Sequence, residues 1–326
     1  MKEIIKHYLP SEIRERAVKA EEQINNSLLE IRLRCGRPLE FVTGWKSYFV
    51  TSRGMLLDIC NSEQGAEEAF IPERELLERA VLMITENSPY AVRDKLSEGF
   101  ITLPGGHRVG FSGRVVLEKG EIVTLRDIGG INYRISREVI GCAEQVAGLI
   151  YDRDRGVFHN TLIVSPPMAG KTTLLRDLIR LASTGRPEDG IRGHKVGVVD
   201  ERSEIAGVYR GRPGNDLGPR TDIMVDCPKA EGMIMLIRSM SPEIIAADEI
   251  GSEEDVRALK KAVNSGVRVF ATVHGAGMDT LLGHPDLCQL VDEKVFSRFL
   301  FLSKKEGIGT LECIKNVRGE VICQCR

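Results

Sequence analysis

The sequence predicts an α/β protein, in which a domain with a parallel sheet is preceded by a smaller α+β domain. From about residue 158 onward, short apolar runs alternate with helical patterns, which is typical of a parallel sheet with helices on both faces. Before residue 141 this alternation is absent, and helical and strand patterns are mixed. Polar residues also follow the apolar runs of the second part, where such sheets collect their ligands. We therefore expect an N-terminal domain over residues 1–140 and the α/β domain over residues 141–326.

The N-terminal part carries both helical and strand signals. Apolar residues at helical spacing predict helices over residues 10–26 and 72–87. Alternation of apolar and charged residues within the segment 29–43 predicts a strand. From Gly99 onward the sequence favours strands, with a hairpin turn at residues 118–121. These last strands are rich in arginine.

The second part alternates strands with helices. Continuous apolar runs predict the strands, which are expected over residues 161–164, 195–200, 243–249 and 267–274. The helices are expected over residues 171–183, 229–240 and 252–266, the last opened by a capping box of Ser252 and Asp255. Polar residues lie at, or just past, the strand ends, namely Ser165, Asp200, Asp248 and His274.

The composition is that of an ordinary globular chain. Of its 326 residues, 28% are charged and 42% belong to the group AVILMFWYC, and the net charge is −2. Such a balance disfavours nucleic acid as a partner. The N-terminus is charged at once, and no apolar run approaches the ~20 residues that a membrane span requires. We expect a cytoplasmic protein whose association with a membrane is peripheral, through a partner.

The eight cysteines are scattered, and none forms a CxxC pair. Reduced thiols are therefore expected. Cys313, Cys323 and Cys325 could meet on a C-terminal hairpin and hold a metal ion. Because no fourth ligand is evident, this metal site is the minor alternative.

The segment "SPPMAGKTT" has the ending of a phosphate-binding loop. Gly170, Lys171 and Thr172 supply the turn into a helix, a cation for the terminal phosphates and a hydroxyl for Mg²⁺. Ser165 stands in place of the usual first glycine, and two prolines follow it. The strand–loop–helix context favours a working ATP site over an accidental match. The residues assigned to nucleotide contact are Ser165, Pro166, Pro167, Met168, Ala169, Gly170, Lys171, Thr172 and Thr173.

Two acids end the strand "EIIAADE" downstream of this loop. Asp248 is suited to hold Mg²⁺ together with Thr172, and Glu249 is suited to polarise the attacking water. The alternative is a solvated acid pair, which becomes the minority interpretation beside an upstream phosphate loop. The extra strand between loop and acids, with a glutamate after the Mg²⁺ acid, is typical of ATPases that carry their own catalytic base.

The strand "KVGVVD" also ends in acids, and their role has two alternatives. Asp200, Glu201 and Glu204 either orient water or support Mg²⁺, or they pair with the arginines of residues 209–220. Glu201 is the second candidate for the catalytic glutamate. His274, at the end of "ATVH", is expected to sense the γ-phosphate or to couple it to the next loop, rather than to be only structural.

Together, "SPPMAGKTT", "VDERSE", "RSMSPEIIAADEIG" and "ATVHG" resemble the motifs of the secretion-ATPase family, which powers type II and type IV secretion and pilus retraction. The arginine-rich "EIRLRCGRPL", "GGHRVGFSGR" and "RDIGGINYRI", with "GPRTD" and "CPKAEGM", narrow the resemblance to a branch specific to sporulation. The resemblance covers nearly the whole chain. It implies an ATPase of the channel apparatus between mother cell and forespore, on the mother-cell side.

The resemblance further implies a RecA-like ATPase domain behind the N-terminal domain, assembled as a ring, expected to be a hexamer, with an inner-membrane partner. It implies that arginines of the N-terminal domain reach the nucleotide on closure, and the motif positions offer Arg108, Arg114, Arg126 and Arg134. Which of them makes the contact stays open. Ser165 and the pair Met168–Ala169 depart from the family pattern, which puts affinity and turnover in doubt more than binding.

Two other functions compete with an ATP-hydrolysing motor. A nucleotide-sensing scaffold would bind ATP and seldom hydrolyse it, and the altered loop favours that alternative. A nucleic-acid-dependent ATPase is the other, because the RecA-like fold also serves helicases. The near-neutral chain and the lack of an interleaved basic and aromatic strip count against it.

Overall fold

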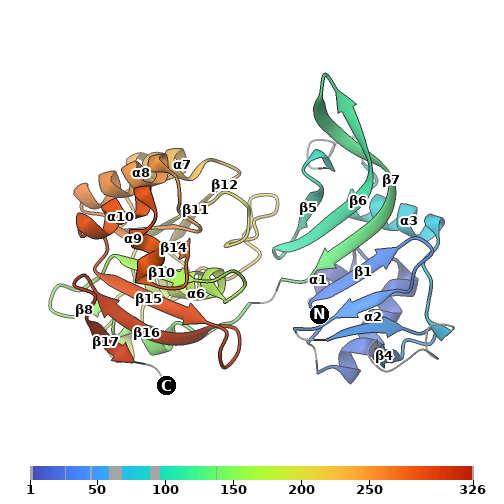
Figure 1. The fold of residues 1–326 in the computed structure, drawn as a ribbon, viewed down its shortest axis with the longest axis horizontal. Helices are drawn as coiled ribbons and strands as arrows, with labels where there is room; N and C mark the ends of the chain where they lie inside the picture. Colours follow the sequence, from blue (N-terminus) through green and yellow to red (C-terminus); the bar gives the residue numbers. More distant parts are fainter. Residues whose placement is uncertain are drawn as a thin grey trace. The chain divides into compact units, whose positions relative to one another are not determined.

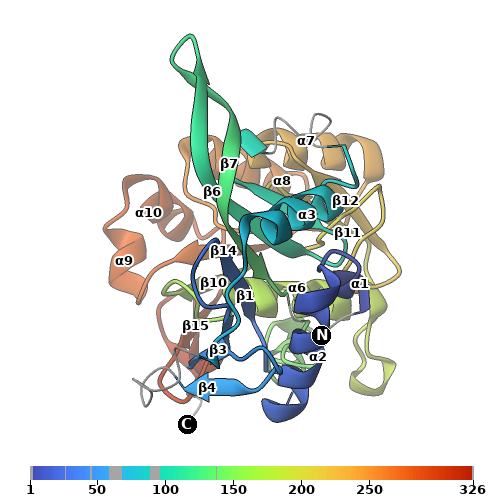
Figure 2. The same cartoon turned by 90° about the vertical axis from the view of Figure 1, so that its right-hand side faces the viewer.

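The computed structural model describes residues 3–25, 27–44, 46–58, 68–88, 96–136 and 138–324 (Figures 1 and 2). Its internal contacts divide the chain into two compact units. The N-terminal unit comprises Met1–Arg137 and Gly207–Gly214, and the C-terminal unit comprises Glu138–Ala206 and Asn215–Arg326. The domain boundary predicted after residue 140 stays a prediction. Within the described part of the chain, no helix is long and apolar enough to cross a membrane.

The N-terminal unit is a seven-stranded antiparallel sheet with helices packed on one face. The strand order is β4-β3-β2-β1-β7-β6-β5. The strands are β1 (Glu30–Arg34), β2 (Glu40–Val42), β3 (Ser47–Val50), β4 (Leu56–Asp58), β5 (Phe100–Leu103), β6 (His107–Glu118) and β7 (Glu121–Arg134). The helices are α1 (Glu3–Lys6), α2 (Ser11–Gln23) and α3 (Arg74–Ile84). Both helices predicted for this part are confirmed as α2 and α3, shorter than predicted at each end.

Alternation along β1 explains how its two faces differ. Ile31 and Leu33 are fully buried against the helices, whereas the charged residues between them lie on the other face. The predicted strand is therefore confirmed, and its charged side chains belong to the face that the helices leave uncovered.

Strands β6 and β7 form a hairpin that extends beyond the neighbouring strands (Figure 1). Its turn is confirmed where it was predicted, with Lys119 and Gly120 both at positive φ, 54° and 88°. The pairing register shifts between Ser112 and Arg114, so the hairpin is irregular at the point where it leaves the sheet.

The C-terminal unit contains an eight-stranded sheet of order β12-β11-β13-β14-β10-β15-β16-β17. Its strands are β10 (Thr161–Ser165), β11 (Val196–Asp200), β12 (Thr221–Val225), β13 (Ile244–Ala247), β14 (Arg268–His274), β15 (Arg298–Ser303), β16 (Thr310–Asn316) and β17 (Val321–Gln324). A short pair, β8 (Tyr151–Asp152) and β9 (Val157–Phe158), precedes them. The helices are α5 (Glu144–Ala147), α6 (Lys171–Thr184), α7 (Lys229–Met240), α8 (Glu253–Asn264), α9 (Met278–Leu282) and α10 (Pro285–Asp292), with a 3₁₀ turn at Pro187–Asp189.

The four predicted strands are confirmed as β10, β11, β13 and β14, and they pair in parallel. The sequence analysis did not predict β12 and β15, which extend this sheet in parallel, or β16 and β17, which add antiparallel strands. Every residue of β10, β11 and β13 is buried, as expected for strands covered on both faces. Ser165 lies opposite His274 in the register, so the carboxyl ends of β10 and β14 meet. The capping box of Ser252 and Asp255 at the start of α8 is also confirmed.

Candidate functional site

The loop between β10 and α6 has the backbone conformation of a tight phosphate loop. Gly170, just before α6, has φ of 91°, and a Cβ there would lie 3.2 Å from the Cα of Gly309. Only glycine fits this position, both for its φ and for its neighbour. Gly309 also donates its N–H to the carbonyl of Ala169 at 3.1 Å, so the turn between β15 and β16 supports the loop from behind.

The unusual first part of the loop is held by its own contacts. Ser165 is fully buried, and its hydroxyl donates to the carbonyl of Pro166 at 3.0 Å. Its carbonyl accepts the N–H of Gly275 at 3.0 Å. Met168, at φ of 59°, projects its side chain outward and is 76% exposed. The serine thus replaces the usual glycine without leaving a buried polar group unsatisfied.

The hydroxyl and the carboxylate predicted to hold Mg²⁺ are in contact. Thr172, on the first turn of α6, donates its hydroxyl to Asp248 Oδ2 at 2.6 Å. Thr272 of β14 donates to the other carboxylate oxygen of Asp248. Hydroxyl and carboxylate oxygens are the ligands that Mg²⁺ prefers, and here they come from the first turn of α6 and from the residue that follows β13. The residues present therefore fit the ion.

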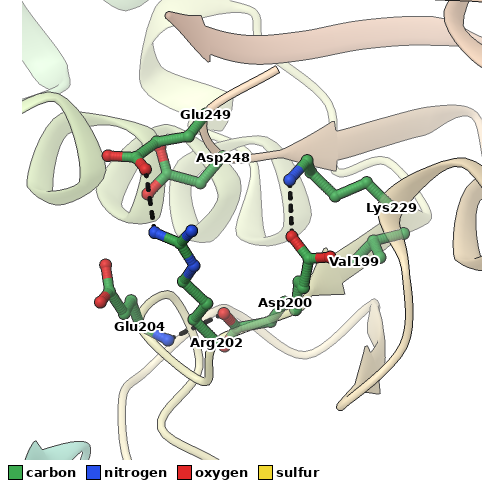
Figure 3. A pocket seen from close by; sticks show the side chains of 8 residues that line it. Val199, Asp200, Arg202, Glu204, Lys229, Asp248 and Glu249 are labelled. Atoms are coloured by element: carbon green, nitrogen blue, oxygen red, sulfur yellow. Dashed lines mark hydrogen bonds and ion pairs between the residues drawn. The ribbon is translucent and has the colours of Figure 1, made fainter. Parts of the chain in front are cut away.

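Glu249 is surrounded by three cationic or potentially cationic groups. Its Oε1 lies 2.6 Å from Lys171 Nζ and 2.9 Å from His274 Nε2. Its Oε2 lies 3.3 Å from Arg202 Nη1 (Figure 3). Burial alone would raise the pKa of Glu249, but the hydrogen bond and charge of Lys171, with His274 and Arg202, lower it below its ordinary value. Glu249 is therefore stabilised as a carboxylate, with cationic partners on both of its oxygens.

The backbone at Glu249 is fixed as firmly as its side chain. The residue has φ of 52°, which is uncommon outside glycine, and its N–H donates to Thr272 Oγ1 at 2.9 Å. Thr272 consequently touches both acids of the site through one hydroxyl. Backbone strain of this kind persists only where the surroundings over-determine it.

Asp200, at the end of β11, accepts hydrogen bonds from backbone N–H groups with its carboxylate. Its two oxygens accept the N–H groups of Glu204, Ile205 and Ala206 at 2.7 to 3.1 Å. Burial raises the pKa of Asp200, and the charge of Asp248 adds to this rise, while the three N–H groups oppose it. In the structure Asp200 therefore shapes the loop that follows it, a role that neither predicted alternative included.

Glu201 and the loop after it lie beside Asp248 and Glu249. Glu201 Oε2 accepts a hydrogen bond from Lys229 Nζ of α7 at 2.6 Å, so its partner is not an arginine of residues 209–220. A small cavity of about 50 Å³ opens here (Figure 3). It is lined by Val199, Asp200, Glu201, Arg202, Glu204, Lys229, Asp248 and Glu249.

The four candidate arginines of the N-terminal unit fall into two pairs. Arg108 stacks on Phe100, with 3.5 Å from its Cζ to the ring centroid, and Arg134 lies 3.7 Å from Glu30. Arg114 and Arg126 are exposed cross-strand partners on the β6–β7 hairpin. Among the residues that the structure describes, neither of these two has an ion-pair partner. Like charges directly opposite on a hairpin repel, so this pair is suited to an anion from outside.

Sequence reasoning missed Arg202 and Thr272 at the site. Arg202 follows the two acids of "VDERSE" and was visible only as a surface charge. Thr272 lies two residues before His274 on the same strand, and its contact with the acids depends on β14 lying next to β13. Thr272 could have been predicted at the site only if the order of the strands in the sheet had been known.

The alternative of a metal site at Cys313, Cys323 and Cys325 receives no support from the described residues. Within them, no group of three or more His, Cys, Asp or Glu side chains could hold a metal ion. Cys313 and Cys323 lie on the adjacent strands β16 and β17, and Cys325 lies outside the described residues.

Comparisons with known proteins agree in both sequence and fold. Over 318 residues the chain is 40% identical to "Stage III sporulation protein AA" of Bacillus subtilis (strain 168), covering 98% of this chain and 96% of that protein. Over 171 residues it is 30% identical to the uncharacterized protein ycf45 of Cyanidium caldarium, covering 51% and 46%.

Two solved structures show the fold. The ATPase DotB of Yersinia pseudotuberculosis has a TM-score of 0.59 at 16% identity, covering 95% of this chain and 80% of that one. The pilus retraction motor PilT with bound ADP has a TM-score of 0.51 at 15% identity, covering 86% and 76%. The predicted RecA-like fold of secretion ATPases is thereby confirmed.

The family model described as "Sporulation stage III, protein AA" matches residues 1–322. With this match across nearly the whole chain, and a relative 40% identical over almost its full length, the chain belongs to the sporulation stage III protein AA family.

Proposed function

We propose that the protein binds Mg²⁺–ATP at the loop before α6 and hydrolyses it, as the motor of a sporulation-specific secretion or channel apparatus. One observation carries the proposal. The phosphate-loop residues Lys171 and Thr172 contact the acids Glu249 and Asp248 at one end of the sheet. A cation for phosphates, two oxygen ligands for Mg²⁺ and a carboxylate base thus meet at one place.

Each residue has a defined task in hydrolysis. The N–H groups at the start of α6 and the ammonium of Lys171 would hold the terminal phosphates. Thr172 and Asp248 would hold Mg²⁺, which neutralises phosphate charge. Glu249 would accept a proton from the water whose oxygen attacks the γ-phosphorus. The bond from that phosphorus to the bridging oxygen breaks, and ADP and inorganic phosphate leave.

The contact between Lys171 and Glu249 links binding to catalysis. In the structure Lys171 Nζ forms a salt bridge with Glu249 Oε1, the oxygen that His274 also contacts. The phosphates of ATP compete for the same ammonium. When Lys171 turns to them, Glu249 regains an oxygen that can accept a proton. Hydrolysis then depends on a base that is freed only when nucleotide is bound.

The N-terminal unit would complete the site on closure. Arg108 and Arg134 already have partners within their own unit, whereas Arg114 and Arg126 face each other and no acid in the described part of the chain pairs with them. We therefore assign Arg114 and Arg126 to the γ-phosphate and Arg108 and Arg134 to the scaffold. Arginines in such a role stabilise transition-state charge, by on the order of a thousandfold in rate.

The motor would work as a homo-oligomeric ring, a hexamer, on the cytoplasmic side of a membrane, on the mother-cell side of the apparatus. The name of the Bacillus subtilis relative supports a role in sporulation, and the pilus retraction motor PilT shares the fold. Contact with the membrane would be made through an inner-membrane component of the channel.

Phosphate release from ATP tests this function most simply. The full-length protein should release inorganic phosphate in the presence of Mg²⁺, and chelation of Mg²⁺ by EDTA should stop it. The Thr172→Val variant keeps the shape of the side chain without its hydroxyl, so it should need more Mg²⁺ for half-maximal rate. No phosphate release under any Mg²⁺ concentration would refute the proposal.

A nucleotide-sensing scaffold is the second candidate. The observation in its favour is that Glu249 contacts three neighbouring groups, Lys171, His274 and Arg202. In a scaffold these ties would persist with ATP bound, so ATP would bind tightly and remain intact. Quantifying bound ATP and ADP after incubation and removal of free nucleotide distinguishes the two functions.

A further inference from the structure

We propose that Arg202 is a positioning residue that sets the orientation of the Glu249 carboxylate for proton transfer once Lys171 has turned to the nucleotide. The proposal rests on the proposed ATPase function and adds a residue that neither the phosphate loop nor the acid pair includes. It starts from the division of contacts on one carboxylate. Lys171 and His274 share Oε1, whereas Arg202 contacts Oε2 at 3.3 Å.

This division matters when nucleotide binds. Loss of Lys171 to the phosphates leaves Glu249 with His274 on one oxygen and Arg202 on the other. Two contacts on different oxygens fix the plane of a carboxylate, whereas one contact allows it to rotate. Because the backbone of Glu249 is already fixed by Thr272, the side chain is the part left to orient. Arg202 supplies the second contact.

The loop that carries Arg202 is held by several hydrogen bonds from buried side chains, although Arg202 itself is exposed. Asp200 accepts three successive N–H groups from Glu204 to Ala206. Arg176, on α6, donates to the carbonyls of Glu204 at 2.6 Å and Ile205 at 2.7 Å. Helix α6 begins at Lys171, so one helix carries the phosphate lysine and also holds the loop that presents Arg202.

Stability does not account for the contact. The side chain of Arg202 is 63% exposed, and that of Glu249 is 29% exposed. An ion pair this open to solvent contributes little to folding. Ser203, directly after Arg202, has φ of 53°, a left-handed conformation that is unfavourable for serine. This conformation lets the chain turn after β11. A strained turn and a buried carboxylate thus fix the backbone of the loop that carries Arg202, although the ion pair of Arg202 with Glu249 adds little to the fold.

The direct test compares Arg202→Ala with wild type in steady-state ATP hydrolysis by the full-length protein. We expect kcat to fall on the order of tenfold, the scale of a misplaced catalytic group, and KM for ATP to change by less than about twofold. Arg202→Lys keeps a cation in reach and should recover part of kcat. Arg257→Ala is the matched control, because Arg257 is an exposed arginine of the same unit whose ion pair, among the described residues, is with Glu253 on its own helix α8.

A double-mutant cycle shows whether Arg202 acts through Glu249. In the Glu249→Gln background, Arg202→Ala should lower kcat by less than about twofold further. Additive effects would mean that Arg202 acts elsewhere, and an Arg202→Ala enzyme with unchanged kcat would also overturn the inference. A change in KM alone would make Arg202 a nucleotide contact instead and reject the positioning role. A wild-type protein without ATP hydrolysis would instead refute the proposed function itself, and this inference with it.

Discussion

Two basic regions of the molecule differ in how their charges are matched. At the end of the C-terminal sheet, Lys171 and Arg202 both contact Glu249, and Lys229 contacts Glu201. On the β6–β7 hairpin of the N-terminal unit, Arg114 and Arg126 oppose each other, and no described acid pairs with them. In the first region the cations are matched by carboxylates, whereas the second carries repelling charges whose natural complement is an anion. Under the proposed function, the first region would bind the nucleotide and the second would accelerate its hydrolysis.

The largest effect is expected from a substitution of Lys171, in the first region. Lys171→Ala removes the main cation for the β- and γ-phosphates and should abolish ATP binding and hydrolysis. Calorimetric or fluorescent titration with ATP measures the binding, and Lys261→Ala, at an exposed lysine of α8, should bind as wild type. Unchanged ATP affinity in a folded Lys171→Ala protein would remove the claim that this loop is a nucleotide site.

The hairpin is tested by Arg114→Ala and Arg126→Ala. Loss of a cation at the γ-phosphate should lower kcat on the order of a thousandfold with a smaller change in ATP affinity. The melting temperature should stay as in wild type, since both side chains are exposed. Lys119→Ala, at the turn of the same hairpin, is the control. If Arg108→Ala or Arg134→Ala lowers kcat more without loss of stability, the assignment of fingers and scaffold is reversed.

Glu249→Gln separates binding from chemistry in the first region. The amide keeps the size of the side chain but cannot accept a proton, so ATP should still bind while hydrolysis falls at least about a hundredfold. Rapid quench of a single turnover measures the chemical step. Normal hydrolysis by Glu249→Gln, together with loss in Glu201→Gln, would transfer the role of base to Glu201.

The smallest effect is expected from Ser165→Gly, which restores the usual first glycine of the loop. Ser165 is buried and its hydroxyl is satisfied by Pro166, so kcat should change by less than about twofold. The free energy of unfolding should fall by about 0.5–1 kcal/mol, because glycine is more flexible in the unfolded chain. A large gain in kcat would show that the natural loop is impaired.

The sequence predicted more of the elements than of their arrangement. Apolar periodicity was enough for α6, α7, α8 and the buried strands, because local pattern and final burial agree there. It missed β12, whose residues are all half-buried, and β15, which pairs in parallel with β10. It also missed β16 and β17, which extend the sheet through antiparallel pairing. Strand order places β14 between β10 and β13, and that order depends on packing between distant segments rather than on local pattern.

The candidate site shows the same limit. Motif spacing indicated Lys171, Thr172, Asp248 and Glu249, because phosphate and Mg²⁺ chemistry restricts the residue types. It gave no sign that Lys171 would contact Glu249, or that Arg202 would reach the other oxygen. These contacts join three separate segments, and only the folded sheet brings them together.

The most direct test of the central claim is the specific ATPase activity of the full-length protein, measured as phosphate release across a wide range of protein concentrations. A motor that acts as an assembled ring should gain activity per chain as it assembles, in parallel with a rise in mass by light scattering, and Glu249→Gln should assemble without this gain. Stable ATP binding with no phosphate release at any concentration would contradict the claim and favour the nucleotide-sensing scaffold.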